Sequence, residues 1–409
     1  MSTRLFSVLV CCFLVTTAWA QELPWQNLKV PSKALALDQP VQVYVPDKYA
    51  TSDQSYPVLY VLDGHWYFFN GVSIQKTLRG NREMPKMIVV GVDMQARPYR
   101  DSLYYQAWDQ VVTFIGEELP AYINANYRTK AESVVFGWEQ SASMVAELLF
   151  REDPPFDGYI LSNGGYVNAQ MIADYKQASQ PKHYAYLANS QQDIYTIDET
   201  KTMVNTLEAH ELGSLQWKSE MHNSEVHETL AYQSMYHGLR FFYHNYPSIV
   251  FADPAEFHER GGLPYLERYF RTRGKRFDLD PEIDASTKNA LIWLAWKRDD
   301  FETFKLAMDS FSEVLETRRY ASAYWQNRLG QFYLKHKHYA PAITFFERGI
   351  NQFPNDRYMA TMHAGLGQAY QATDKRKLAK TNFKKAVRFA REQTDPSLDK
   401  YQELLEELE

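Results

Sequence analysis

A glutamate lies at the centre of the stretch "VVFGWEQSASMV", residues 134–145. Gly137 precedes Glu139 by two positions and Ser141 follows it by two, so small residues flank the glutamate on both sides. A strand that turns sharply into a helix needs such small residues, and the residue at the apex of that turn is usually a serine nucleophile in the spacing Gly-x-Ser-x-Gly. The pattern therefore predicts a nucleophile turn that carries a carboxylate where the attacking hydroxyl is expected. Ser141 and Ser143 are interpreted as residues of the first helical turn.

Two further side chains have the types that assist a nucleophile. His227 follows the last strand-length run of the N-terminal half, where it could act as a base. Asp193 follows the preceding run and could orient the imidazole ring. Asp198 and Glu199 are alternatives for that acid, although acidic residues also favour the first turn of a helix. We favour His227 and Asp193. The competing histidines are His222 and His237.

Backbone N–H groups near the glutamate could stabilise a developing negative charge. One is expected from Gln140, directly after Glu139, and another from the loop Asp63-Gly64-His65. Aromatic side chains close to these positions, above all Trp66 and Trp138, suit an apolar or sugar-like ligand. The predicted oxyanion and substrate-binding residues are Gly64, His65, Trp66, Trp138 and Gln140.

A sheet is needed to bring these residues together. Apolar runs of strand length alternate with longer stretches that are compatible with helices, which is typical of a mostly parallel sheet with right-handed crossovers. The runs lack strict apolar–polar alternation, as expected for strands that are covered on both faces. They lie at residues 41–45, 58–62, 87–92, 133–136, 158–161, 183–188 and 215–220.

The C-terminal part carries a different signal. Residues 285–409 are predicted to be helical almost throughout, and one pattern of residues recurs within them after 37 positions. This pattern resembles tetratricopeptide repeats, which implies stacked helix pairs that present a surface to a partner protein. The repeat positions are Leu329, Gly330, Tyr333, Tyr339, Ala342, Phe346 and Pro354, and the same register recurs at Leu366, Gly367, Tyr370, Ala379, Phe383 and Ala386.

The first residues are interpreted as an export signal. Arg4 precedes an almost wholly apolar run, and Ala18-Trp19-Ala20 fits a cleavage site before Gln21. Cys11 and Cys12 lie inside this segment, so the mature protein is expected to contain no disulfide and no cysteine-ligated metal. We expect a periplasmic or secreted protein. The predicted divisions are a signal peptide at 1–20, an α/β domain at 21–250, a linker at 251–284 and a helical repeat domain at 285–409.

Composition limits the classes of partner. The chain has 409 residues, is 45% hydrophobic, and carries 44 basic against 50 acidic residues, a formal net charge of −6. Nucleic-acid binding usually needs a basic face, which this balance does not suggest. The histidines lack the pairing with acids that metal ligands show, so no metal and no cofactor are expected.

Several motifs together carry a family resemblance. "YPVLYVLDGHWYF", "MPKMIVVGVD", "RPYRDSLYY", the turn at Gly137 and "HETLAYQSMYHGLRFFY" occur in the order found in the esterase family related to esterase D and enterochelin esterase. The resemblance spans most of residues 35–245. It implies an α/β-hydrolase fold, a mostly parallel sheet with helices on both faces, and serine hydrolysis of ester substrates. Here the chain departs from the family, because Glu139 replaces the serine.

Three interpretations of Glu139 remain open. In the first, the protein is catalytically impaired or non-catalytic and binds a ligand or partner, and the Glu139 anion occupies the oxyanion position and pairs with the His227 imidazolium. In the second, Glu139 is itself the nucleophile, as aspartate is in haloalkane dehalogenases and epoxide hydrolases. In the third, His227 activates a water molecule and ester hydrolysis persists weakly.

Overall fold

The structure, a computed structural model, describes residues 25–177 and 182–408, except for the side chain of Gln177. The chain divides into two compact units, Met1–Pro247 and Ser248–Glu409, called here the N-terminal and C-terminal units. The predicted signal segment, with both cysteines and the cleavage site before Gln21, lies outside the described residues. Within the described ranges, every helix is too short or too polar to cross a bilayer.

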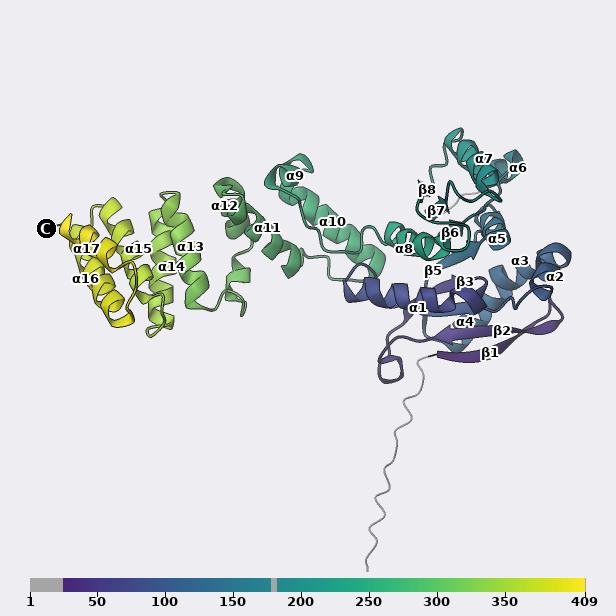
Figure 1. Cartoon of the computed structure of the whole chain (residues 1–409), viewed down its shortest axis with the longest axis horizontal. Coiled ribbons are helices and arrows are strands. Elements are labelled where there is room, and N and C mark those ends of the chain that lie inside the picture. The colour runs from purple at the N-terminus through teal and green to yellow at the C-terminus, as the bar shows by residue number, and fades with distance from the viewer. Residues whose placement is uncertain (1–24, 178–181, 409) are drawn as a thin grey trace, which may run out of the picture. The chain divides into compact units, whose positions relative to one another are not determined.

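An eight-stranded sheet forms the centre of the N-terminal unit, in the order β1-β2-β4-β3-β5-β6-β7-β8 (Figure 1). Strand β2 pairs antiparallel with both β1 and β4, and every pairing from β4 to β8 is parallel. The strands are β1 (Trp25–Ser32), β2 (Leu37–Tyr44), β3 (Tyr56–Val61), β4 (Ile88–Val92), β5 (Thr129–Trp138), β6 (Gly158–Ser162), β7 (His183–Asn189) and β8 (Leu215–Met221). All seven predicted strands are present, and β1 is additional.

Helices cover both faces of this sheet, which explains the missing alternation in the strands. Successive side chains of a strand point to opposite faces. On one face, Leu59 and Val61 pack against Gly71 of helix α1. On the other face, Val58 and Tyr60 belong to the main hydrophobic core. The helices are α1 (Gly64–Gly80), α2 (Tyr99–Gln106), α3 (Trp108–Thr113), α4 (Leu119–Asn126), α5 (Gln140–Leu149), α6 (Ala169–Gln177), α7 (Ile197–Glu208) and α8 (Leu230–Phe242), with a π-helical segment, Phe114–Glu118, between α3 and α4.

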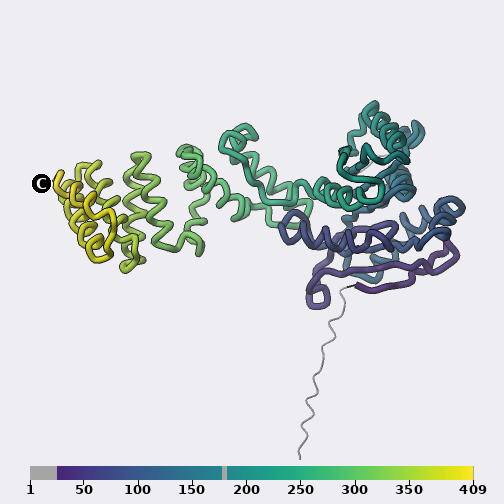
Figure 2. Tube along the Cα trace, in the orientation of Figure 1, coloured from purple at the N-terminus to yellow at the C-terminus, as the bar shows by residue number. Residues whose placement is uncertain are grey.

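The C-terminal unit is helical in its described residues (Figure 2). Residues 251–284, predicted as a linker, carry helices α9 and α10, and the two units divide before this segment, at Pro247. The helices are α9 (Pro254–Glu259), α10 (Gly262–Phe277), α11 (Ala285–Lys297), α12 (Phe301–Ser310), α13 (Ala323–Lys335), α14 (Tyr339–Gln352), α15 (Met359–Ala372), α16 (Arg376–Gln393) and α17 (Leu398–Glu406), with a 3-10 helix at Ser312–Glu316.

One packing contact occurs twice in this unit. Gly330 of α13 lies against the ring of Phe346 of α14, and 37 residues later Gly367 of α15 lies against the ring of Phe383 of α16. A Cβ atom at either glycine would come within 2.6 Å of the ring. Consecutive helices therefore approach each other in the same way in both pairs, which agrees with the 37-residue period of the sequence.

Candidate active site

The turn from β5 to α5 has the conformation that the sequence predicts. Glu139 lies between the two elements with φ 59° and ψ −123°, a strained combination for a residue with a side chain. Two neighbouring positions, 137 and 164, have room only for glycine. A Cβ at Gly137 would lie 2.3 Å from the carbonyl oxygen of Ser141, and a Cβ at Gly164 would lie 2.6 Å from the carbonyl oxygen of Glu139. Glu139 is thus held at the apex of a tight strand-to-helix turn.

The carboxylate of Glu139 pairs with two arginines. Its Oε2 atom accepts a hydrogen bond of 3.1 Å from Nη1 of Arg100, and its Oε1 atom lies 3.8 Å from Nη2 of Arg97. The expected pairing of Glu139 with the His227 imidazolium is wrong as far as the described residues show. Arg100 is closer, is completely buried and directs its charge at the glutamate.

Arg100 is the centre of a buried polar network. Its guanidinium makes a bidentate pair with Asp63, at 2.7 Å from Nε to Oδ1 and 3.0 Å from Nη2 to Oδ2. Nη1 also donates to the side-chain oxygen of Gln140 at 2.8 Å. Burial alone would lower the pKa of Arg100, but the hydrogen bonds and charge of Asp63 outweigh burial and raise that pKa. Arg100 therefore remains a cation although it is removed from water. The guanidinium also lies over three aromatic rings, those of Trp66, Tyr104 and Trp138.

Asp63 lies two residues after the end of β3 and directly before α1, with a left-handed backbone conformation (φ 53°), and its side chain is buried. Besides Arg100, it accepts a hydrogen bond of 2.9 Å from the hydroxyl of Ser141. That hydroxyl in turn accepts the backbone N–H of Trp138 at 2.7 Å. Ser141 is fully buried at the second position of α5, so it stabilises the turn from inside and does not occupy the apex.

The histidine and acid that the sequence favours lie together. Nδ1 of His227 is 3.1 Å from Oδ1 of Asp193, close enough for an ion pair although the angle is poor for a hydrogen bond. Asp193 is completely buried, which by itself would raise its pKa; hydrogen bonds from Thr196 and Tyr195, together with the nearby His227, outweigh burial and lower the pKa of this carboxyl. Asp193 is therefore an anion that can orient the imidazole. The alternatives Asp198 and Glu199 are exposed in the first turn of α7.

The loop that carries His227 is anchored to β5. The indole N–H of Trp138 donates to the backbone oxygen of His227 at 2.9 Å, and the side-chain amide of Asn163 donates to the same oxygen. The rings of Trp138 and His227 are 4.8 Å apart. The histidine is thus fixed beside the turn that presents Glu139. The competing histidines His222 and His237 lie together elsewhere, with ring centroids 5.2 Å apart.

The predicted oxyanion residues begin two helices. Gly64 and His65 open α1 and Gln140 opens α5, where backbone N–H groups have no acceptor within the helix. A Cβ at Gly64 would lie 2.7 Å from the backbone of Gly91, so only glycine fits there. Burial lowers the pKa of His65, whose ring is therefore neutral at pH 7. Trp66 is half exposed and packs edge-on against Trp138, 5.7 Å away, at the rim of the site.

Sequence reasoning did not identify the pairing of Asp63 with Arg100. A signal for it exists, because Asp63 comes at the end of an apolar run, and a carboxylate in that place needs a partner once it is buried. No motif links the two residues, however, since they are 37 positions apart and meet only through the fold. In the described part of the chain, histidine, cysteine, aspartate and glutamate side chains form no cluster of three that could hold a metal ion.

Comparisons with known proteins show the family and the fold of the N-terminal unit. The sequence model of one family, described as "Putative esterase", matches residues 32–249. An IroE-like serine hydrolase from Shewanella oneidensis is similar in structure, with 16% identity, a TM-score of 0.50, and coverage of 70% of this chain and 98% of that one. An uncharacterised protein from Capnocytophaga ochracea has 18% identity, a TM-score of 0.56, and coverage of 80% and 93%. At these identities the likeness concerns the fold. The search of curated proteins gives no match.

Proposed function

The chain belongs to this esterase family, and we propose that it uses the esterase site to bind a ligand rather than to form an acyl-enzyme. The geometry of Glu139 carries the proposal. A carboxylate lies at the position from which a family serine attacks, and a completely buried arginine, Arg100, donates to it at 3.1 Å.

Two chemical reasons make this glutamate a poor nucleophile for esters. Its negative charge is shared with a guanidinium, which reduces its tendency to attack a carbonyl carbon. An attack would also give a tetrahedral intermediate, from which the carboxylate leaves more readily than the alkoxide, so the reaction would revert before a mixed anhydride forms. The exposed aromatic rings at the rim, Trp66, Tyr105 and Tyr195, suit a small apolar or sugar-like ligand. The exposed cation of Arg97 adds a contact for a polar group of that ligand.

A second candidate function is weak ester hydrolysis. The contact between His227 and Asp193 favours it, because an oriented imidazole can remove a proton from water without a serine. A variant of this candidate uses Glu139 itself as the nucleophile. Both mechanisms require that the natural protein hydrolyses esters, so a measurement of its turnover distinguishes them from ligand binding alone.

The test compares hydrolysis of a short-chain nitrophenyl ester by the natural protein and by Glu139→Ser. We expect no turnover by the natural protein above that of His227→Ala. Glu139→Ser should hydrolyse the ester faster by about 10²-fold or more, because general-base activation of a positioned hydroxyl typically contributes 10² to 10⁴. His227→Ala should abolish this gain, whereas the matched control His222→Ala should leave it unchanged.

The same assay identifies the alternatives. Turnover by the natural protein that is lost in both His227→Ala and Glu139→Gln would establish Glu139 as a working carboxylate. Turnover that is lost in His227→Ala and kept in Glu139→Gln would establish activated water. Either result would contradict the binding proposal.

Two further properties are proposed for the rest of the chain. The repeated contact of Gly330 and Gly367 with phenylalanine rings supports tetratricopeptide repeats in the C-terminal unit. The sequence Ala18-Trp19-Ala20 supports export with cleavage before Gln21. Mass spectrometry of the protein from the cell envelope should find Gln21 as the N-terminal residue, and an intact Met1 would contradict export.

A further inference from the structure

Aromatic side chains form a continuous surface in the C-terminal unit. They come from α11, from α13 and from the residue before α15, and each ring is partly exposed. The ring centroids are 5.1 Å apart for Trp293 and Trp296, 5.8 Å for Trp293 and Trp325, 5.5 Å for Tyr324 and Trp325, and 5.8 Å for Tyr324 and Tyr358. We call these five residues the aromatic surface.

Four cations lie over these rings. The guanidinium carbon of Arg328 is 4.2 Å from the centroid of Trp296 and 4.9 Å from that of Tyr324. Arg319 lies 5.6 Å from Trp325, Lys297 lies 5.4 Å from Trp293, and Arg357 lies 5.0 Å from Tyr358. In the described part of the chain, none of the four has a carboxylate within ion-pair distance.

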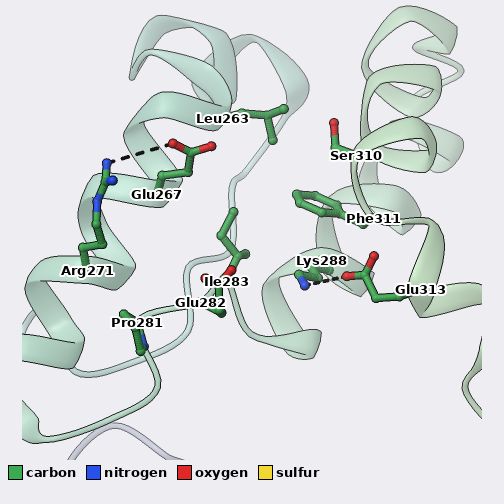
Figure 3. Close-up of a pocket in the computed structure, with 10 residues that line it drawn as sticks. All are labelled: Leu263, Glu267, Arg271, Pro281, Glu282, Ile283, Lys288, Ser310, Phe311 and Glu313. Atoms are coloured by element: carbon green, nitrogen blue, oxygen red, sulfur yellow. Dashed lines mark hydrogen bonds and ion pairs between the residues drawn. The ribbon is translucent and has the colours of Figure 1, made fainter.

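A pocket elsewhere in the C-terminal unit differs from the aromatic surface, because its cations are paired with carboxylates. This pocket, of about 530 Å³, is lined by residues of α10, α11 and the segment after α12 (Figure 3). Lys288 pairs there with Glu313 at 2.6 Å, and Arg271 lies 4.0 Å from Glu267. The cations of that pocket are neutralised within the chain. Those of the aromatic surface keep their charge available to an outside anion.

A second, apolar pocket adjoins the aromatic surface. It has a volume of about 360 Å³, and its lining includes Val250, Phe251 and Leu294. Trp293 of the aromatic surface and Lys297, the cation over its ring, both belong to this lining. An apolar side chain in the pocket would therefore lie next to a cation.

We propose that the aromatic surface and this pocket bind an acidic peptide segment of a partner protein. Carboxylates of the peptide pair with Arg328 and Lys297, and an aliphatic or aromatic side chain of the peptide enters the pocket. Charge complementarity selects the anion, and the rings, which hold the cations in place, add apolar contact area. Tryptophan, tyrosine and arginine are also the residues that contribute most to protein–protein binding. The apolar lining favours a peptide over a nucleic acid. This proposal is independent of ligand binding in the N-terminal unit.

The test uses the full chain and a fluorescein-labelled peptide that alternates Asp-Glu pairs with leucine and phenylalanine. Fluorescence anisotropy should show saturable binding that weakens as salt is raised. A peptide with Asn and Gln in place of the acids should bind at least about tenfold more weakly, since each removed ion pair of this kind costs a measurable part of the affinity. Arg328→Gln should weaken binding of the acidic peptide by about tenfold, and the exposed Lys297→Gln by about threefold.

The matched control is Arg388→Gln. Arg388 also lies over a ring, that of Phe389, but pairs with Glu392, so its loss should leave peptide affinity unchanged. Should Arg328→Gln fail to fold, Lys297→Gln and the neutral peptide decide the outcome. The proposal is overturned if the neutral peptide binds equally well, if Arg388→Gln weakens binding as much as Lys297→Gln, or if the acidic peptide does not bind. If a single-stranded oligonucleotide binds more tightly than the acidic peptide, the proposal is also overturned, and the partner of the aromatic surface is a nucleic acid.

Discussion

Two arginines, one in each unit, have similar aromatic surroundings and opposite charge balance. Arg100 lies among Trp66, Tyr104 and Trp138, and Arg328 lies among four rings of the C-terminal unit. Arg100 is fully buried and donates to two carboxylates, those of Asp63 and Glu139. Arg328 is partly exposed and has no carboxylate partner among the described residues. Both arginines therefore stack on aromatic rings. They differ in their acidic partners: Arg100 is neutralised by carboxylates of the chain and has a structural role, whereas Arg328 can bind an external anion.

The comparison predicts a large difference in stability when each arginine is neutralised. Arg100→Gln leaves Asp63 buried without its cation, which should cost about 3–5 kcal/mol of unfolding free energy. Arg328→Gln removes no ion pair and should cost only about 1 kcal/mol. Calorimetric unfolding of the full chain should show the larger loss in the transition of the N-terminal unit.

The matched control for Arg100 is Arg97→Gln. Arg97 is 61% exposed and lies 3.8 Å from the same glutamate, so its removal should cost less than about 1 kcal/mol. An Arg100→Gln protein that is as stable as Arg97→Gln would show that the buried pair with Asp63 does not stabilise the fold.

The two units also differ in how far sequence predicted their structure. The apolar runs of the central strands were found because both of their faces are buried. Strand β1 was missed because it is an edge strand in which Gln26, Asn27, Lys29 and Pro31 are exposed, so it lacks the continuous apolar run of a buried strand. Residues 251–284 are predicted as a linker, and they carry α9, which begins at Pro254; the side chain of Asp253 directly before it accepts the N–H of Glu256 as a helix cap.

For the site, local patterns predicted local features only. The turn at Glu139 and the positions of His227 and Asp193 follow from small residues and from loops after strands. The buried network beside Glu139 does not, because Arg100 reaches the glutamate from α2 and the second partner of Arg100, Asp63, comes from the loop after β3. Such contacts depend on how neighbouring strands align, which no local spacing of residues encodes.

A second prediction concerns the repeated contact of the C-terminal unit. Gly330→Ala and Gly367→Ala should each destabilise this unit by about 1–3 kcal/mol, because the added methyl group would lie 2.6 Å from a phenylalanine ring. Similar losses in both variants would support one repeated structural unit. Gly80→Ala is the control, since a Cβ there meets no atom within 4 Å, and it should be neutral or slightly stabilising. Equal effects of all three changes would contradict the repeated contact.

A smaller effect is expected from one buried histidine in each unit. Burial lowers the pKa of His183 in β7 and of His363 in α15. In the unfolded chain each histidine takes up a proton near pH 6.5, its ordinary pKa. In the folded protein the same histidine stays neutral until a lower pH. Each histidine contributes stability that is complete above about pH 6.5 and is lost as the pH falls through its folded pKa.

The measurement for this prediction is the melting temperature of each unit between neutral and mildly acidic pH. His363→Gln should flatten the acid-side decrease for the C-terminal unit only, and His183→Gln for the N-terminal unit only. In terms of the unfolding free energy plotted against pH, the expected change in slope is at most about 1.4 kcal/mol per pH unit for each histidine. An unchanged slope in both variants would contradict the assignment of acid sensitivity to these side chains.

The central claim is that Glu139, held by Arg100, occupies the position of the attacking serine and prevents acyl-enzyme formation. The most direct test is the intact mass of the protein after treatment with a fluorophosphonate, which forms a covalent bond with an activated serine. The natural protein should keep its mass, and Glu139→Ser should gain one adduct that maps to residue 139 and disappears in Glu139→Ser with His227→Ala. An adduct on Ser141 or on another serine of the natural protein would contradict the claim.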